Sequence, residues 1–141
     1  LITHHKDKAV LTLMNMDSIV ETDFLTVRPN MDLGEMVKII SKSFRNQFPV
    51  VDVGGELIGM VVLDDIRNII FRQELYHRFH VEGFMKVPKT RIVNTDSMEK
   101  FDTTGAWNLP VVDREGKYIG MVSKSKMLNT YRQVMVDFSE E

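Results

Sequence analysis

Two pairs of residues are the most obvious candidates for chemistry in this sequence. Asp64 and Asp65 are paired carboxylates, but sequence neighbours point apart on a helix, so they do not form a general acid–base couple. His77 and His80 are three residues apart, which on a predicted helix could bring two imidazoles to one metal ion. No third ligand is evident in the sequence. We therefore favour surface or interface histidines and predict no metal site.

The sequence also lacks the motifs of a catalytic centre. It has no Walker loop, no zinc-binding motif and no nucleophile elbow. It has no cysteine, which excludes disulfides, thiol catalysis and thiolate metal sites. The formal net charge of -2 gives no general attraction to nucleic acid. The sequence therefore predicts a protein that is not an enzyme and has no nucleic-acid partner.

The composition is that of an ordinary globular protein. The chain has 141 residues, 43% hydrophobic and 27% charged, which suits one compact domain or two small modules with a shared core. No apolar run approaches the ~18 residues that a membrane-spanning helix needs. The chain begins at Leu1 rather than at Met, so we expect it to be a piece of a longer protein.

An internal repeat organises the chain. Residues 48–70 match residues 109–131 at ten of 23 positions when they are shifted by 61. In each copy two aliphatic runs flank a glycine-containing turn, which is typical of a β-hairpin. Apolar residues at helical spacing follow each hairpin, and an extended piece and a helix precede it. Each copy therefore predicts the order strand, helix, strand, strand, helix.

The two copies differ in the helix before the hairpin. Leu33 aligns with Met98 at an offset of 65, whereas Pro49 aligns with Pro110 at an offset of 61. The second copy thus lacks four residues, about one helical turn. Either that helix is shorter, or a segment is missing between Met98 and Phe101. We favour the missing segment, because so few residues leave too little helix to cover a sheet face.

The repeated sequence segments resemble the cystathionine-β-synthase (CBS) domain. The similarity consists of an apolar residue before Pro-Val-Val-Asp, then a turn, Ile-Gly-Met-Val and a helix. CBS domains occur in tandem, and the resemblance implies an α+β fold of two β-α-β-β-α modules related by pseudo-two-fold symmetry. We expect a linker at residues 1–16, a first module at 17–80 and a second module at 81–141.

A narrower resemblance is found in residues 3–14, 45–51 and 63–67. These stretches are similar to the cytoplasmic tail of bacterial ClC chloride channels and transporters. The resemblance implies a regulatory module on the cytoplasmic side of the inner membrane, joined to the membrane domain of its parent and modulating chloride transport. It also implies a homodimer. Two alternatives stay open: a CBS-pair nucleotide sensor on another transporter or a metabolic enzyme, and a dimerisation tail without ligand.

CBS domains bind ligands through a motif that follows the second hairpin strand: Gly, two apolar residues, Ser or Thr, two more residues, then Asp. A hydroxyl at a helix N-terminus can bind phosphate, and an Asp one turn later can accept both ribose hydroxyls. The first copy keeps the carboxylate as Asp65 but has Val62 in place of the hydroxyl. The second keeps the hydroxyl as Ser123 but has Lys126 in place of the carboxylate. The resemblance thus implies two unlike sites and ATP, ADP or AMP as regulatory ligand.

The resemblance adds five further candidates for the nucleotide cleft. Thr26 and Val27 match the edge where family members hold the adenine through backbone groups, and strand core is their structural alternative. Phe48 and Leu109 precede the repeated prolines, and we expect them, with Pro49, to line either the cleft or the core.

The polar candidates also have structural alternatives. Asp65 would stabilise the start of a helix even without a ligand. Ser123 would act as a helix N-cap, which we favour over a ligand contact. Lys126 could meet a phosphate, although a solvated surface position is favoured. Trp107 could stack on a base, but packing is the favoured role for a lone Trp beside a buried strand.

Overall fold

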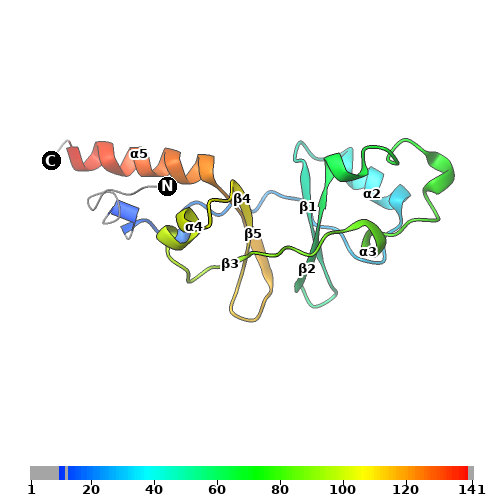
Figure 1. Ribbon diagram of the computed structural model, residues 1–141, viewed down its shortest axis with the longest axis horizontal. Coiled ribbons are helices and arrows are strands. Elements are labelled where there is room, and N and C mark those ends of the chain that lie inside the picture. Colours follow the sequence, from blue (N-terminus) through cyan, green and yellow to red (C-terminus); the bar gives the residue numbers. More distant parts are fainter. Residues whose placement is uncertain (1–9, 12, 140–141) are drawn as a thin grey trace. The chain divides into compact units, whose positions relative to one another are not determined.

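The computed structural model describes residues 10, 11 and 13–139, and it combines helices with small sheets (Figure 1). Packing divides the chain into two compact units. Unit 1 comprises Leu1–Thr22, Thr90–Arg114 and Ile119–Glu141, and unit 2 comprises Asp23–Lys89 and Glu115–Tyr118. The predicted α+β class is confirmed. The module boundaries predicted at 17–80 and 81–141 follow the sequence repeat rather than this packing, and they stay predictions.

Unit 2 is built on an antiparallel hairpin of β1 (Gln47–Val51) and β2 (Leu57–Val62). The turn between them is closed by Asp52, whose Oδ1 accepts hydrogen bonds from two backbone N–H groups of the turn at 2.9 Å each. Gly55 has a φ of 86°, in the left-handed region that favours glycine. The hairpin predicted from the Gly-Gly turn is therefore present.

Other segments extend this hairpin at both edges. Val27 forms a parallel bridge with Val50 on the β1 side. Lys86 forms an antiparallel bridge with Met60 on the β2 side. The extended piece predicted before the first helix is thus reduced to a single bridge residue, Val27, beside β1.

Helix α2 (Leu33–Ile40) begins with a capping box. The Asp32 side chain accepts from the Glu35 backbone N–H at 2.8 Å, and the Glu35 side chain accepts from the Asp32 N–H at 3.3 Å. The helix buries Leu33 and Met36. Met36 joins Val27, Phe48, Val50, Val61 and Ile66 in the core of unit 2.

The segment after β2 differs from the prediction. Instead of one amphipathic α-helix it contains three short helices: η2 (Leu63–Ile66), η3 (Gln73–Leu75), both 3-10, and α3 (Val81–Phe84). Neighbouring Ile69, Ile70 and Phe71 are β-branched or aromatic and favour helices weakly, which is a physical reason for the early break. His77 and His80 consequently do not share a helix, so that part of the prediction is wrong.

Unit 1 contains most of a second sheet and its helices. The order is η1 (Met16–Ser18), β3 (Ile92–Val93), α4 (Met98–Thr104), β4 (Asn108–Val112), β5 (Tyr118–Ser123) and α5 (Lys124–Ser139). The sheet order is β3-β4-β5, with β3 parallel to β4. The core of unit 1 joins Leu11 and Ile19 to Phe101, Val111, Val122 and Met127. No helix in the described part of the chain could span a membrane.

Helix α4 shows where the four-residue difference between the copies lies. It has seven residues against eight in α2, and it runs without interruption from the Ser97 cap to Gly105. The loop to the next strand covers three positions, 105–107, whereas the corresponding loop after α2 covers six, 41–46. One residue of helix and three of loop account for the whole difference. The favoured interpretation of a segment missing between Met98 and Phe101 stays a prediction.

Candidate functional site

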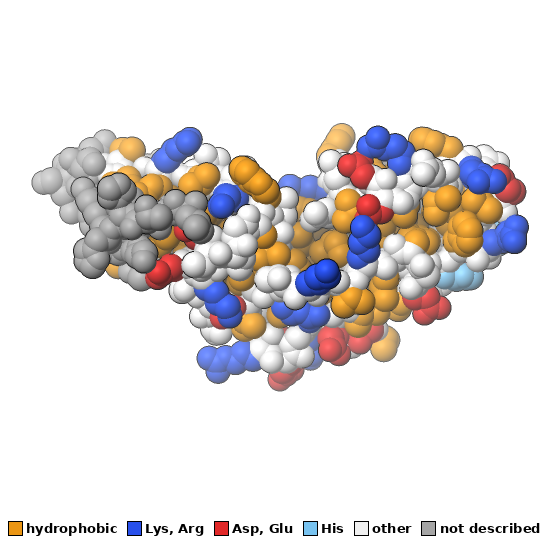
Figure 2. All heavy atoms as spheres, viewed as in Figure 1, with side chains coloured by type: hydrophobic (Ala, Val, Ile, Leu, Met, Phe, Trp, Pro, Cys, Tyr) orange, Lys and Arg blue, Asp and Glu red, His pale blue; other side chains and the backbone are white. Residues whose placement is uncertain are grey.

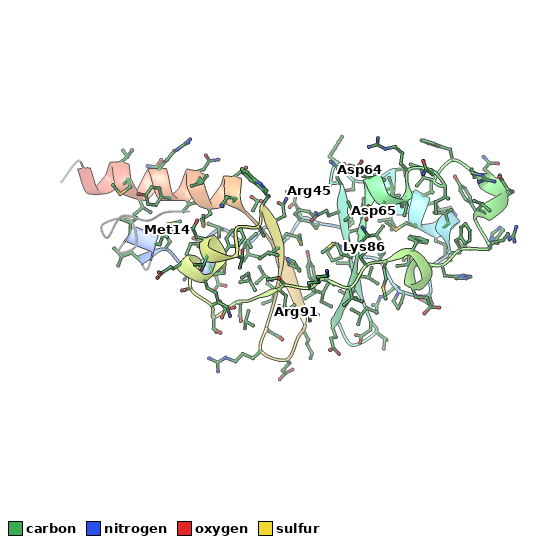
Figure 3. The ribbon with its side chains drawn as sticks, in the orientation of Figure 1. Met14, Arg45, Asp64, Asp65, Lys86 and Arg91 are labelled. Atoms are coloured by element: carbon green, nitrogen blue, oxygen red, sulfur yellow. The ribbon has the colours of Figure 1, made fainter. Side chains whose placement is uncertain are left out.

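Asp65 lies in η2, directly beyond β2, and its carboxylate is held by a cation. Its Oδ2 atom is 2.9 Å from Nζ of Lys86, and the two side chains are 35% and 69% exposed respectively. The neighbouring carboxylate, Asp64, pairs instead with Arg67. Figure 3 labels Asp64, Asp65 and Lys86, which lie at the same end of unit 2. The two adjacent carboxylates thus have different cationic partners, and only Asp65 is paired across the fold.

The backbone of Lys86 is fixed against β2 by two hydrogen bonds. The Met60 N–H donates to the Lys86 carbonyl at 2.7 Å, and the Lys86 N–H donates to the Met60 carbonyl at 2.9 Å. We call this backbone pairing of Lys86 with β2 a crossing. It depends on Gly59, because a Cβ atom there would lie 2.5 Å from Sδ of Met85 and 3.3 Å from the Lys86 carbonyl oxygen. Lys86 was not among the residues predicted for the site. A glycine inside a strand was the one available signal of a close crossing.

The other unit 2 candidates lie along β1. Val27 is buried, and its N–H and carbonyl are both hydrogen-bonded, to Pro49 and Val51 at 2.9 Å each. Its neighbour Thr26 is exposed. Phe48 is fully buried in the core of unit 2, and Pro49 is buried as well. Among these candidates, Thr26 is therefore the one whose side chain can be reached from solvent.

In unit 1, Ser123 caps helix α5. Its Oγ atom accepts a hydrogen bond from the Lys126 backbone N–H at 3.1 Å, so the N-cap interpretation is confirmed. Leu109 is buried in the unit 1 core. Trp107 is 68% exposed, with the Lys124 ammonium 5.7 Å from its ring centroid. The favoured packing role for Trp107 is therefore wrong.

Unit 1 contains a crossing like the one at Lys86. Here the residue that pairs with the strand is Glu21: its N–H donates to the Met121 carbonyl at 2.8 Å, and the Met121 N–H donates to the Glu21 carbonyl at 2.9 Å. A Cβ atom on Gly120 would lie 2.5 Å from the Glu21 carbonyl oxygen and 2.6 Å from a methyl group of Val20. Because Gly120 and Met121 are the repeat counterparts of Gly59 and Met60, the two crossings are equivalent.

The charges at the two crossings are opposite. Unit 2 has a cation on the crossing segment, Lys86, and an anion at the helix start, Asp65. Unit 1 has an anion on the crossing segment, Glu21, and a cation at the equivalent helix position, Lys126. The sequence had indicated that the two copies differ at the motif position of Asp65 and Lys126. The structure adds a second position where they differ, that of Lys86 and Glu21.

A second polar cluster in unit 2 surrounds Arg45. Its Nη2 atom contacts both carboxylate oxygens of Asp23, at 2.7 and 2.9 Å, and its guanidinium lies 4.3 Å from the ring centroid of Phe24. The hydrogen bond from Arg45 lowers the pKa of Asp23. Burial, with a smaller contribution from the Asp23 charge, raises the pKa of Tyr118. The raised pKa keeps this tyrosine protonated at neutral pH. Among the described residues the Tyr118 hydroxyl has no hydrogen-bond partner.

One hollow in unit 2 does not have Asp65 in its lining. It has a volume of about 470 Å³ and is lined by Ile69, Arg78, Phe79, His80, Glu82 and Phe84. Figure 2 shows orange hydrophobic side chains exposed over the part of unit 2 that carries α2 and α3.

In the described ranges, no three His, Cys, Asp or Glu side chains are placed to hold a metal ion.

Comparisons with known proteins identify the repeated module. The family model described as "CBS domain" matches residues 16–72 and 95–132. A relative from Methanocaldococcus jannaschii, "Uncharacterized protein MJ0188", is 29% identical over 112 residues, which cover 75% of this chain. The match spans only 40% of that relative's own length.

Solved structures share the same fold at low sequence identity. The structure of CbpB in complex with c-di-AMP superimposes with a TM-score of 0.75 at 12% identity, covering 96% of this chain and 95% of that one. The structure of CBSX2 in complex with AMP superimposes with a TM-score of 0.68 at 21% identity, covering 85% of this chain and 96% of that one. At these identities the likeness establishes the fold alone.

Proposed function

Because the chain belongs to the CBS domain family, we propose that it is a non-catalytic regulatory module that binds an adenine nucleotide through Asp65. The observation that carries the proposal is the placement of a reachable carboxylate one turn beyond strand β2, 35% exposed and adjacent to a cation. A carboxylate in this position can accept hydrogen bonds from both hydroxyls of a ribose. ATP, ADP and AMP are the candidate ligands.

The ion pair at Asp65 is compatible with ligand binding. Exposed pairs of this kind contribute only ~0.2–1 kcal/mol. Two charge-assisted hydrogen bonds from a ribose would offset the loss of the Lys86 contact, since each is worth ~1.5–3 kcal/mol. Thr26, Val27, Phe48 and Pro49 stay candidate contacts for a nucleotide at the unit 2 site. Ser123 and Leu109 stay candidates at the equivalent position in unit 1.

The choice of an adenine-containing ligand is supported by the fold relatives. CbpB was solved with c-di-AMP and CBSX2 with AMP. Both ligands contain an adenine and a ribose. A nucleotide would regulate the parent protein only if it bound two conformations of the module with different affinity.

The decisive measurement is calorimetric titration of the chain with ATP, ADP and AMP. We expect Asp65→Ala to weaken binding about ten- to hundredfold, because a charged hydrogen bond is lost. Asp64→Ala is the matched control, since it removes the adjacent carboxylate, which pairs with Arg67 instead. The proposal fails if the unaltered chain gives no heat at millimolar nucleotide, or if both variants bind equally.

A second proposal concerns the parent protein. We propose that the module is attached to a ClC-type chloride channel or transporter, on the similarity of residues 3–14, 45–51 and 63–67 to those tails. Residues 3–9 and Thr12 lie outside the described residues. None of the relatives named above is described as a chloride channel. A parent gene that encodes few membrane helices upstream of Leu1 would rule this attachment out and favour a sensor on another protein.

The proposed homodimer has its own test. Sedimentation equilibrium of the chain, with and without AMP, would give its mass in solution, and a mass of one chain under both conditions would contradict it. A dimer that binds no nucleotide would favour the dimerisation tail.

A further inference from the structure

We propose that Lys86 selects phosphorylated ligands at the Asp65 site, so that the module responds to nucleotides and not to nucleosides. This inference rests on the proposed function, because it assigns ligand class to the same site. It begins from a contact that the ligand motif does not contain: the ammonium of Lys86 lies 2.9 Å from the carboxylate that would receive the ribose.

Lys86 has a backbone that is held against β2 and a side chain that is mostly exposed. Its backbone is hydrogen-bonded to Met60 in both directions. Its side chain is 69% exposed and, among the described residues, has one recorded ion pair, with Asp65. The side chain can therefore rotate to another anion while the Lys86 backbone stays hydrogen-bonded to β2.

Ribose binding would release this ammonium. If the two ribose hydroxyls occupy the Asp65 carboxylate, they replace the contact with Lys86. The phosphate of a nucleotide is attached to the same ribose. It therefore supplies an anion close to the ammonium that the ribose has released. An ammonium–phosphate contact is a charge-assisted hydrogen bond, which is stronger than one between neutral groups. Adenosine has no phosphate, so it would break the ion pair and leave Lys86 without a new anion.

The equivalent crossing in unit 1 supports the assignment. There the backbone position of Lys86 is taken by Glu21, which also pairs in both directions with its strand. A carboxylate at that position would repel a phosphate. The two copies therefore have opposite charges at the crossing residue, and a phosphate would be attracted in unit 2 and repelled in unit 1.

The test compares AMP with adenosine by calorimetric titration of the unaltered chain and three variants. We expect the unaltered chain to bind AMP at least about tenfold more tightly than adenosine. In Lys86→Met, which keeps an unbranched apolar stem, the preference should fall to about twofold or less, while adenosine affinity is unchanged or slightly higher. Lys86→Arg should retain the preference because the charge is kept. Lys42→Met is the control for loss of one exposed charge in unit 2.

The possible outcomes separate the two proposals. If AMP and adenosine bind equally to the unaltered chain, or if Lys86→Met leaves the preference intact, the inference about Lys86 is overturned while the Asp65 site stands. If neither compound binds, the proposed function fails and the inference fails with it. Weaker binding of both compounds to Lys86→Met, with an unchanged ratio, would assign Lys86 a structural role only.

Discussion

Gly59 and Gly120 are each required by a backbone that crosses the strand beside them. The obstacles differ, however. At Gly59 the nearest atom to an added Cβ is the end of the flexible Met85 side chain, whereas at Gly120 it is the backbone carbonyl oxygen of Glu21. A thioether can move aside at little cost, but a carbonyl that is hydrogen-bonded in the crossing cannot.

Substitution of the two glycines should therefore have unequal effects. We expect Gly120→Ala to lower the free energy of unfolding by about 1–3 kcal/mol, as overpacking does, and Gly59→Ala by less. Gly83→Ala is the control, since its added Cβ would meet nothing within 4 Å. Urea denaturation of the three variants measures the difference, and equal losses at Gly59 and Gly120 would contradict the distinction drawn between side-chain and backbone obstacles.

At the scale of single residues, the sequence indicated Asp65 and Ser123 but not their surroundings. The motif alone located both residues, since glycine, apolar pair and polar residue follow one another in the chain. The ion pair of Asp65 with Lys86 could not be predicted this way, because it depends on a backbone crossing between Met60 and Lys86, which are 26 positions apart in the sequence. Phe48 and Leu109 illustrate the same limit. Both are buried in the cores, and the residues next to them in the sequence did not show whether they would line the cores or a cleft.

Among the elements, helix α2 has the most complete N-terminal cap. The hydrogen bond from the Glu35 N–H is the main cause that lowers the pKa of Asp32, and the hydrogen bond with His77, 3.1 Å away, lowers it further. A carboxyl whose pKa is lower in the folded state than in the unfolded state binds its proton less tightly when folded. Its contribution to stability is therefore present above the unfolded pKa and is lost as the pH falls through the folded pKa.

The acid dependence of α2 can be isolated by one substitution. Asn caps helices about as well as Asp but has no charge to lose. We expect the thermal midpoint of the unaltered chain to fall more steeply below about pH 4 than that of Asp32→Asn, with the two curves close to each other at neutral pH. Thermal melts followed by circular dichroism from pH 2.5 to 7 test this. Parallel curves over the whole range would show that the cap charge does not contribute.

Element prediction succeeded where local signals agreed and failed where they conflicted. Both hairpins and α2 combine alternation or helical spacing with clear turn or cap residues. After β2 the apolar spacing favoured a helix, but the β-branched run from Ile69 did not, and the chain forms short 3-10 turns. In the second copy the spacing of apolar residues did not show how the four-residue difference divides between helix and loop, because a shorter helix and a shorter loop give the same offset.

For the whole molecule, the opposite charges at the two crossings predict one occupied site. Unit 2 offers Asp65 and Lys86 to a ribose and a phosphate, whereas unit 1 offers Lys126 and Glu21 at the same positions. We expect titration with AMP to give about one nucleotide per chain, since like-charge contacts oppose binding at the second crossing. The double substitution Glu21→Lys with Lys126→Asp should raise the stoichiometry towards two. Two nucleotides per unaltered chain would refute the asymmetry.

Unit 1 is assembled from three separated stretches of chain, whereas almost all of unit 2 comes from one. Leu11 and Ile19 share their core with Met127 in α5. During synthesis the nascent chain therefore carries these apolar side chains without their final partners until α5 has been translated. Deletion of α5 would remove a packing partner of Leu11 and Ile19, more than a hundred residues earlier in the chain, and it would leave the stretch from Asp23 to Lys89 comparatively intact.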